Sequence, residues 1–337
     1  MIVYYLLLFC SALIFSSQFL ITRQYQRRNG TGFMSSVKLS FYAYFAIALF
    51  FFVKGCIVAK HLNIGFSAFT FLITILVAVV SLLCVYMGIK VLAVGDLSIY
   101  SVFMMLGSLV LPTLAGIFFY DEKITGLKAA ALLMMAAAIV CSVSAADKNK
   151  FTWKALLYYI GVFVMNGMIG VLFTIHQNHA ELTAAAISSP DGYAVNNDVF
   201  MTWYGLSTVL LSGAIMAVYA VVKKIKSRKA DRGQTELTAV TDLAQSAALK
   251  SGAMKAYAIT VGLAALYGLC NGFGDYFIAL ATQPHALGAS VTFPVINGGT
   301  ILFSTLSGCL FFKEKIKAGT IVSLILVLTS TILFMFV

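Results

Sequence analysis

One phrase is written twice in this chain, and its repetition decides the fold. Residues 116–128 read GIFFYDEKITGLK and residues 308–320 read GCLFFKEKIKAGT. The match continues upstream of both phrases in a single alignment register, which pairs Gly107 with Gly299. The sequence therefore indicates one structural unit that is present in two copies.

The two phrases lie in a strongly apolar chain. Of the 337 residues, 61% are hydrophobic and only 10% are charged, and the mean hydropathy is +0.95. Soluble domains use roughly 45–50% apolar residues, so this composition indicates a membrane protein. Its apolar runs are long and continuous, and such segments satisfy their backbone hydrogen bonds inside a bilayer only as helices. The predicted fold class is an all-α integral membrane bundle of about ten transmembrane helices. They are predicted at residues 2–22, 33–53, 66–89, 97–119, 125–146, 152–175, 199–222, 255–281, 287–312 and 318–337.

The repeat divides the predicted helices into two units, residues 1–150 and residues 151–337. Each unit has five helices, and because five is an odd number the second copy enters the membrane inverted. Two near-equivalent inverted halves can exchange conformations, so that a site between them opens first to one side and then to the other. The repeat thus predicts a secondary transporter that works by alternating access.

The distribution of basic residues among the loops predicts which side of the membrane each loop faces. The net charge is +11, but the Lys and Arg residues gather between apolar spans, so no nucleic-acid partner is predicted. With loops numbered from the N-terminus, the even loops hold Lys54, Lys60, Lys123 and Lys128, and the odd loops hold all the others. By the positive-inside rule, the odd loops are cytoplasmic and both termini face outward. The segment 223–255 is interpreted as a solvated basic loop, with a regulatory or lipid-binding role as the alternative.

Polar side chains inside the predicted spans are the candidate solute ligands, since such groups usually face the bundle interior or a wet cavity. Tyr267, Asn271 and Asp275 follow one another at intervals of four residues and so share one helix face. Asp275 is also the candidate for proton coupling. The alternative is a hydrogen-bonded packing patch between helices. The complete predicted substrate-binding set is Tyr86, Asn166, Tyr267, Asn271, Asp275 and Asn297.

The segment FPVINGG, which begins at Phe293, predicts a local helix distortion. Pro294 removes one helical hydrogen bond, while Gly298 and Gly299 allow close approach. Broken helices at membrane depth tend to line cavities, and a small-residue packing seam is the alternative. The sequence contains no phosphate-binding Walker motif, and we predict neither a cofactor nor a metal site.

The same motifs carry a family resemblance. A ten-span chain in two halves, with DEKI at 121–124, KEKI at 313–316 and FPVINGG opening the ninth span, resembles the EamA-like branch of the drug/metabolite transporter superfamily. The resemblance implies a 5+5 inverted bundle in the cell membrane that moves small metabolites or drugs, often outward, through a central cavity. The expected partners are a small-molecule substrate, the lipid bilayer and a coupling proton. The assembly is left open between monomer and homodimer.

A catalytic alternative rests on four residues. Gly272, Phe273, Gly274 and Asp275 spell GxGD, which resembles the motif around one catalytic aspartate of intramembrane aspartyl proteases. Such a protease needs a second carboxylate within a few ångströms, because the two acids share a proton. Asp121 is the available candidate, but it lies at the end of a span. We therefore expect no enzymatic activity.

Overall fold

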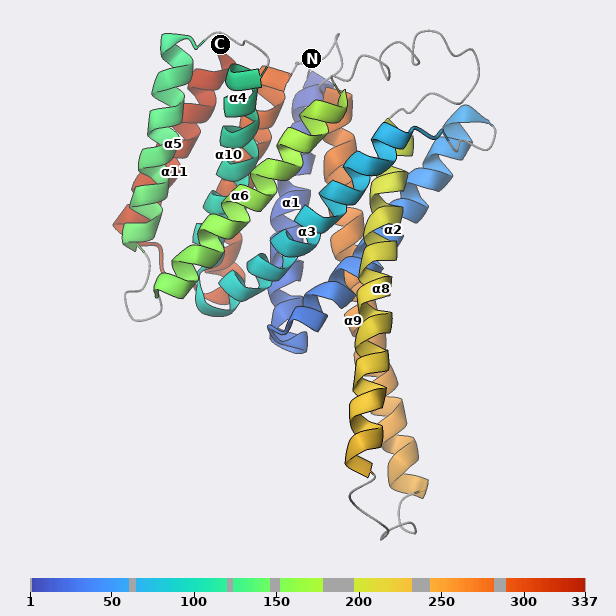
Figure 1. Cartoon of the computed structure of the whole chain (residues 1–337). Helices are drawn as coiled ribbons and strands as arrows, with labels where there is room; N and C mark the ends of the chain where they lie inside the picture. The colour runs from blue at the N-terminus through green and yellow to red at the C-terminus, as the bar shows by residue number, and fades with distance from the viewer. Residues whose placement is uncertain are drawn as a thin grey trace.

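Ten helices make up the described part of the chain in this computed structural model (Figure 1). The structure describes residues 2–60, 65–119, 124–145, 152–177, 197–231, 243–281 and 289–336. The helices are α1 (Ile2–Asn29), α2 (Phe33–Ala59), α3 (Ala68–Val94), α4 (Leu97–Phe119), α5 (Gly126–Ala145), α6 (Trp153–Gln177), α8 (Asn197–Asp231), α9 (Leu243–Ala281), α10 (Ala289–Phe312) and α11 (Ala318–Met335). Within these ranges, nine helices are long and apolar enough to cross a membrane, and α11 contributes a shorter apolar stretch. The predicted all-α, multi-pass membrane bundle is confirmed.

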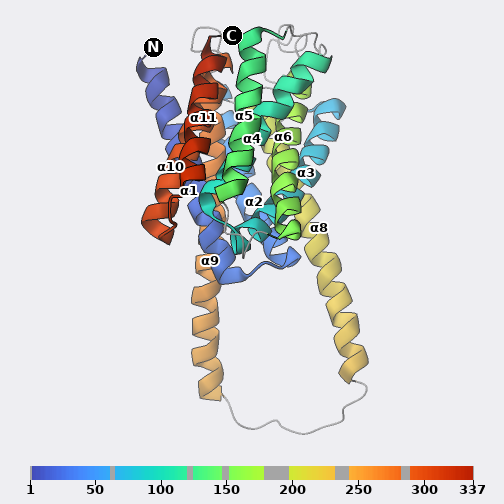
Figure 2. The ribbon, with the colours of Figure 1, turned by 90° about the vertical axis from the view of Figure 1, so that its left-hand side faces the viewer.

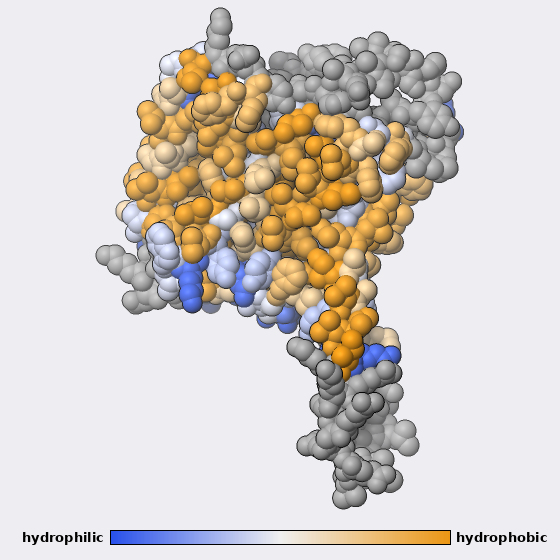
Figure 3. Space-filling model, viewed as in Figure 1, coloured by the Kyte–Doolittle hydropathy of each residue, from blue (hydrophilic) through white to orange (hydrophobic). Residues whose placement is uncertain are grey.

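The outer surface of the bundle is apolar. Figure 3 shows hydrophobic side chains covering most of the visible face of the helices. On α5, Leu133 and Val140 lie two turns apart on one side, and they are 71% and 67% exposed. Large exposed apolar patches are rare on soluble proteins, whereas the hydrocarbon of a bilayer accepts them at no cost. This surface therefore faces lipid.

Helix packing follows a regular scheme. α1 packs against α9 and α10, and α6 packs against α3 and α4. α2 packs against α8 and α9, and α8 packs against α2 and α3. Two further pairs, α5 with α11 and α4 with α10, complete the main contacts. The scheme is unchanged when α1, α2, α3, α4 and α5 are exchanged in that order with α6, α8, α9, α10 and α11.

Two glycines lie at equivalent close helix contacts in this scheme. A Cβ atom added to Gly107 of α4 would lie 2.2 Å from the Phe163 carbonyl oxygen of α6. A Cβ atom added to Gly299 of α10 would lie 3.0 Å from the Cβ atom of Ala12 in α1. The alignment register of the repeated phrase pairs these two glycines. Each sits where the fourth helix of one half meets the first helix of the other.

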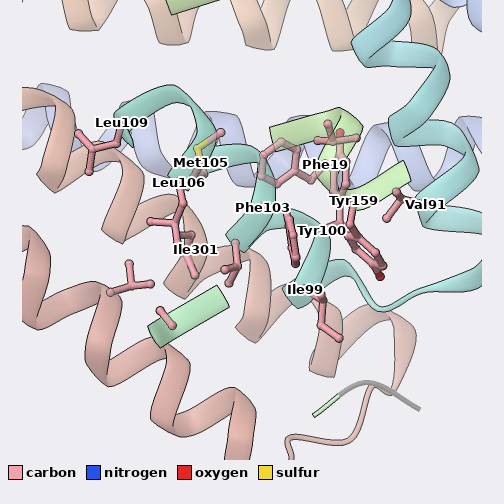
Figure 4. Close-up of a cluster of buried hydrophobic side chains, with 14 of the residues drawn as sticks. Phe19, Val91, Ile99, Tyr100, Phe103, Met105, Leu106, Leu109, Tyr159 and Ile301 are labelled. Carbon is pink, nitrogen blue, oxygen red and sulfur yellow. The ribbon is translucent and has the colours of Figure 1, made fainter. Parts of the chain in front are cut away.

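The largest buried apolar cluster surrounds the start of α4 (Figure 4). Phe19 of α1 packs edge-to-face on Tyr100, with ring centroids 5.2 Å apart. Phe103 packs against Tyr159 of α6 at 5.0 Å. Because these rings come from three helices, they fix α4 between α1 and α6.

The basic segment 223–255 is mostly helical, which corrects its prediction as a loop. α8 continues to Asp231 and α9 begins at Leu243, so only residues 232–242 lie outside the described ranges. Figures 1 and 2 show both helices extending beyond the rest of the bundle at one end. The segment is rich in Lys and Ala, which are strong helix formers, and this propensity accounts for the extension.

Candidate functional site

A cavity of about 160 Å³ lies between seven helices from both halves of the chain. Its position corresponds to the middle of the bundle, because its lining residues come mostly from the central turns of their helices. Its volume is enough for several water molecules or a small organic group. The lining residues are Phe15, Gln18, Phe19, Thr22, Tyr44, Ser81, Cys84, Val85, Tyr100, Met104, Met105, Ser108, Asn166, Ile169, Gly170, Phe173, Tyr204, Tyr267, Asn271 and Asp275.

One side of the cavity carries a chain of hydrogen bonds between α1 and α9. Gln18 Nε2 donates to Asn271 Oδ1 at 3.0 Å, and Asn271 Nδ2 donates to Asp275 Oδ2 at 3.1 Å. Ser11 of α1 supports this contact by donating to the Gly274 carbonyl oxygen at 3.1 Å. Together these bonds orient one carboxylate oxygen of Asp275 toward the Asn271 amide.

A second polar group, made of three hydroxyls, lies on α2, α3 and α8. The Tyr44 and Tyr204 hydroxyl oxygens are 2.6 Å apart, and Ser81 Oγ also hydrogen-bonds to the Tyr204 hydroxyl. All three residues line the cavity and are at most 4% exposed. Hydroxyl groups both donate and accept, so this cluster can adapt to either kind of group on a bound solute.

Four of the six predicted substrate-binding residues line this cavity. They are Asn166, Tyr267, Asn271 and Asp275. The α9 residues reach the cavity from one face of their helix, as their spacing predicts. Asn166 donates from Nδ2 to the Met104 carbonyl oxygen at 2.7 Å, so its amide ties α6 to α4 as well as facing the cavity.

Tyr86 and Asn297 are not among the lining residues. The Tyr86 ring packs edge-to-face on Phe33 with centroids 5.5 Å apart, and Lys90 Nζ lies 5.5 Å from its centre. Asn297 is 6% exposed on α10, and its Nδ2 atom has no hydrogen-bond partner within the described ranges. The part of α3 that lines the cavity is Ser81, Cys84 and Val85, and no described residue of α10 belongs to the lining.

The predicted distortion in α10 corresponds to close helix packing outside the cavity lining. The helix runs from Ala289 to Phe312 with Pro294 inside it. A Cβ atom added to Gly298 would lie 2.9 Å from Thr331 Oγ1 of α11, and Gly299 faces α1. These glycines therefore fit the packing-seam alternative.

Sequence reasoning missed several lining residues, above all Gln18, Tyr44, Ser81 and Tyr204. Gln18 carried a usable signal, because an amide within a long apolar span is costly unless it has a partner. Tyr44 and Tyr204 gave no comparable signal, since tyrosines are frequent in this chain and many occupy helix ends.

A buried carboxylate lies at the end of the bundle where α1 finishes and α4 begins, here named the Glu314 end. Glu314 forms an ion pair with Arg23, and the two side chains are 6% and 11% exposed. Its Oε1 atom accepts a hydrogen bond of 2.7 Å from the Leu97 backbone N–H, in the first turn of α4. Arg23 also lies over the Phe312 ring at 4.4 Å. One acid thus joins α1, α4 and the segment that follows α10.

The repeated phrase supplies the geometry that positions Glu314. Lys313 adopts a left-handed backbone conformation with φ of 55°, which turns the chain at the end of α10. The Glu314 N–H then donates to the Gly308 carbonyl oxygen at 3.2 Å. A Cβ atom on Gly308 would lie 2.5 Å from Glu314 Oε2, so only glycine leaves room for this carboxylate. The corresponding residues of the first phrase, Asp121 and Glu122, lie outside the described residues.

A second ion pair marks the opposite end, here named the Asp198 end, where α2 finishes and α8 begins. Lys54 Nζ donates to Asp198 Oδ1 at 2.5 Å. The same ammonium group lies 4.2 Å from the centre of the Tyr276 ring, and Tyr276 follows the cavity residue Asp275. The cavity therefore has a buried or half-buried ion pair beyond it on each side.

The described ranges offer few residues for a metal site or for an aspartyl protease. They contain no group of three or more His, Cys, Asp or Glu residues close enough to hold a metal ion. Of the residues that line the cavity, Asp275 is the one carboxylic acid. The protease candidate Asp121 lies outside the described residues.

The comparisons with known proteins support the fold alone. No family model matches the sequence, and no curated protein matches it. A solved structure titled only "Crystal structure of protein" superposes with a TM-score of 0.51 at 11% identity, covering 96% of this chain and 94% of its own. At this identity the two chains share an architecture of membrane-type helices, and no function transfers between them.

Proposed function

We propose that this protein is a secondary transporter that moves small organic solutes across the membrane by alternating access. The observation that carries the proposal is the central cavity, which α1–α4 of residues 1–150 and α6, α8 and α9 of residues 151–337 build together. Polar side chains at membrane depth are costly and are kept where they bind a solute or an ion. A polar cavity shared by two halves is the arrangement that alternating access requires.

Helix packing supports the proposal that the halves are inverted copies of one unit. Exchanging the first five helices with the last five leaves the main packing pairs unchanged. The aligned glycines Gly107 and Gly299 serve the same contact, between the fourth helix of one half and the first of the other. If the halves are equivalent, an exchange of their conformations reverses the side to which the cavity opens.

The two ion pairs suggest how access alternates. Thr22 lines the cavity next to Arg23, and Asp275 lines it next to Tyr276, which contacts Lys54. Opening the Glu314 end requires α1 to separate from the segment after α10, and opening the Asp198 end requires α2 to separate from α8. In the proposed cycle, one ion pair breaks while the other stays formed. Asp275 carries the coupling proton between the two states.

Solute identification is the first test of this proposal. Cells that lack the gene are compared with cells that carry it, and metabolites are profiled inside and outside. The family resemblance favours outward transport across the cell membrane, so we expect one solute class to accumulate inside the deleted cells. Purified protein in proteoliposomes should then exchange labelled for unlabelled solute of that class. Identical profiles and no exchange would refute transport.

The aspartyl protease alternative has a separate test. Purified protein is incubated with a model transmembrane peptide, and the same assay is run on Asp275→Asn and Asp121→Asn variants. The transporter proposal predicts no cleavage in any sample. Cleavage that requires both aspartates would replace it.

A further inference from the structure

The charge of the cavity restricts what it can bind. The residues that line it include one acid, Asp275, and no Lys, Arg or His. An ionised Asp275 therefore leaves the cavity with a net negative charge. A buried charge without a partner is unfavourable, so the ionised state needs a cation from outside the protein.

The nearby cations of the bundle already have partners. Arg23 pairs with Glu314 at one end, and Lys54 pairs with Asp198 at the other. Neither of these two ion pairs includes Asp275. Asp275 Oδ2 accepts a hydrogen bond from the Asn271 amide, which is a neutral group. An incoming cation thus has an acid to bind, and none of the lining residues of the described chain is a Lys, Arg or His that would compete for it.

The rest of the lining suits an apolar body with a polar head. Its side chains include four tyrosines, three phenylalanines and two methionines. Aromatic ring faces attract ammonium groups, and they also pack well against aromatic and aliphatic carbon. The Tyr204 and Ser81 hydroxyl oxygens can accept further N–H bonds from such a head group.

We propose that the transported solute is a small organic monoamine in its ammonium form, with nitrogen bound to Asp275 and an apolar, typically aromatic, body against the rings of the cavity. This inference rests on the proposed transport function and names its substrate class. It also excludes zwitterions. The carboxylate of an amino acid would meet no cation in the lining and would lie close to Asp275, which carries the same charge.

Four probes of similar shape test the inference directly. They are 2-phenylethylamine, its alcohol analogue 2-phenylethanol, phenylalanine, which adds only a carboxylate, and 3-phenylpropionate, which replaces the amine by an acid. Binding to the purified full-length protein is measured by titration calorimetry at one fixed pH. We expect the amine to bind at least tenfold more tightly than each of the other three.

Two variants and a control assign that preference to one residue. Asp275→Asn should reduce amine affinity to that of the alcohol while leaving alcohol affinity unchanged, and Asp275→Glu should retain the preference. Asp231→Asn removes one negative charge at the end of α8, outside the cavity lining, and should bind like the wild type. Unchanged binding of the alcohol shows that the Asn variant is folded.

Several results would overturn the inference. These are failure of the amine to bind, phenylalanine or 3-phenylpropionate binding as tightly as the amine, and a preference for the amine that survives in Asp275→Asn. Transport is judged separately, by counterflow in proteoliposomes. If a carboxylate solute is exchanged, the substrate class is wrong and the transport function stands. If the amine binds selectively but no solute moves, the binding site stands and the transport function fails.

Discussion

At the scale of single residues, Gln18 links α1 to the hydrogen-bonded side chains of α9 that line the cavity. It is 2% exposed, and its side-chain amide donates to Asn271 on another helix. Removing one partner of a buried hydrogen bond leaves the other unsatisfied, at a cost of about 1–3 kcal/mol. Gln18 is therefore a positioning residue, since it acts on Asp275 through Asn271.

A double-mutant cycle measures this role. Gln18→Met keeps the length of the side chain and removes both its donor and its acceptor, while Asn271→Leu removes the next group in the chain. Each single variant should lower the free energy of unfolding by about 1–3 kcal/mol. The double variant should lose less than the sum, because the two residues share one bond. Thermal unfolding in detergent provides the readout, and strict additivity would show that the two side chains act independently.

Asp275 carries the prediction about energy coupling. Asp275→Asn keeps the shape of the side chain and can still bond to Asn271, but it cannot exchange a proton. We expect this variant to lose uptake driven by a pH gradient and to retain exchange at saturating solute, which needs no net proton movement. Both activities are measured in proteoliposomes of equal protein content. Undiminished gradient-driven uptake would limit Asp275 to solute binding and packing.

At the scale of helices, the start of α4 depends on an acid from the other half of the chain. Helix N-termini present unsatisfied N–H groups and favour negative charge, and Glu314 supplies both an acceptor and a charge there. Glu314→Gln should destabilise the protein by about 3 kcal/mol, because Arg23 is left buried without its anion. Lys315→Gln, an exposed neighbour, is the matched control and should change little. Equal unfolding midpoints for the two variants would contradict the structural role of the Glu314 ion pair.

Some properties of the helices that form the site follow from the sequence, and others do not. Their number and apolar character follow from composition and span length. The shared face of Asn271 and Asp275 follows from the helical period. The sequence predicts Tyr86 and Asn297 as site residues because they are polar groups within apolar spans, but it does not fix which helices, or which faces of them, line a cavity. The role of Glu314 could not be predicted because its bond to Leu97 joins residues from the two halves.

At the scale of the whole molecule, the distribution of basic residues predicts its orientation. A reporter inserted near Arg232, between α8 and α9, should remain in the cytoplasm, and one near Asp191 should be exposed outside. The physical reason is that loops rich in Lys and Arg are retained on the cytoplasmic side. Labelling of intact cells with an impermeant reagent checks both sites. Opposite labelling would reverse the orientation and leave the helix packing unchanged.

The bond between Glu314 and the first turn of α4 also has a consequence for biosynthesis. Leu97 and Glu314 are 217 residues apart, so at about 5–20 residues per second the acid leaves the ribosome roughly 10–40 s after the helix it supports. During that interval the backbone N–H of Leu97, in the first turn of α4, lacks its acceptor on Glu314. We expect a chain that stops after Phe312 to be degraded faster in a pulse-chase experiment than one that stops after Ile316. Equal lifetimes would show that completion of the bundle does not wait for this one carboxylate.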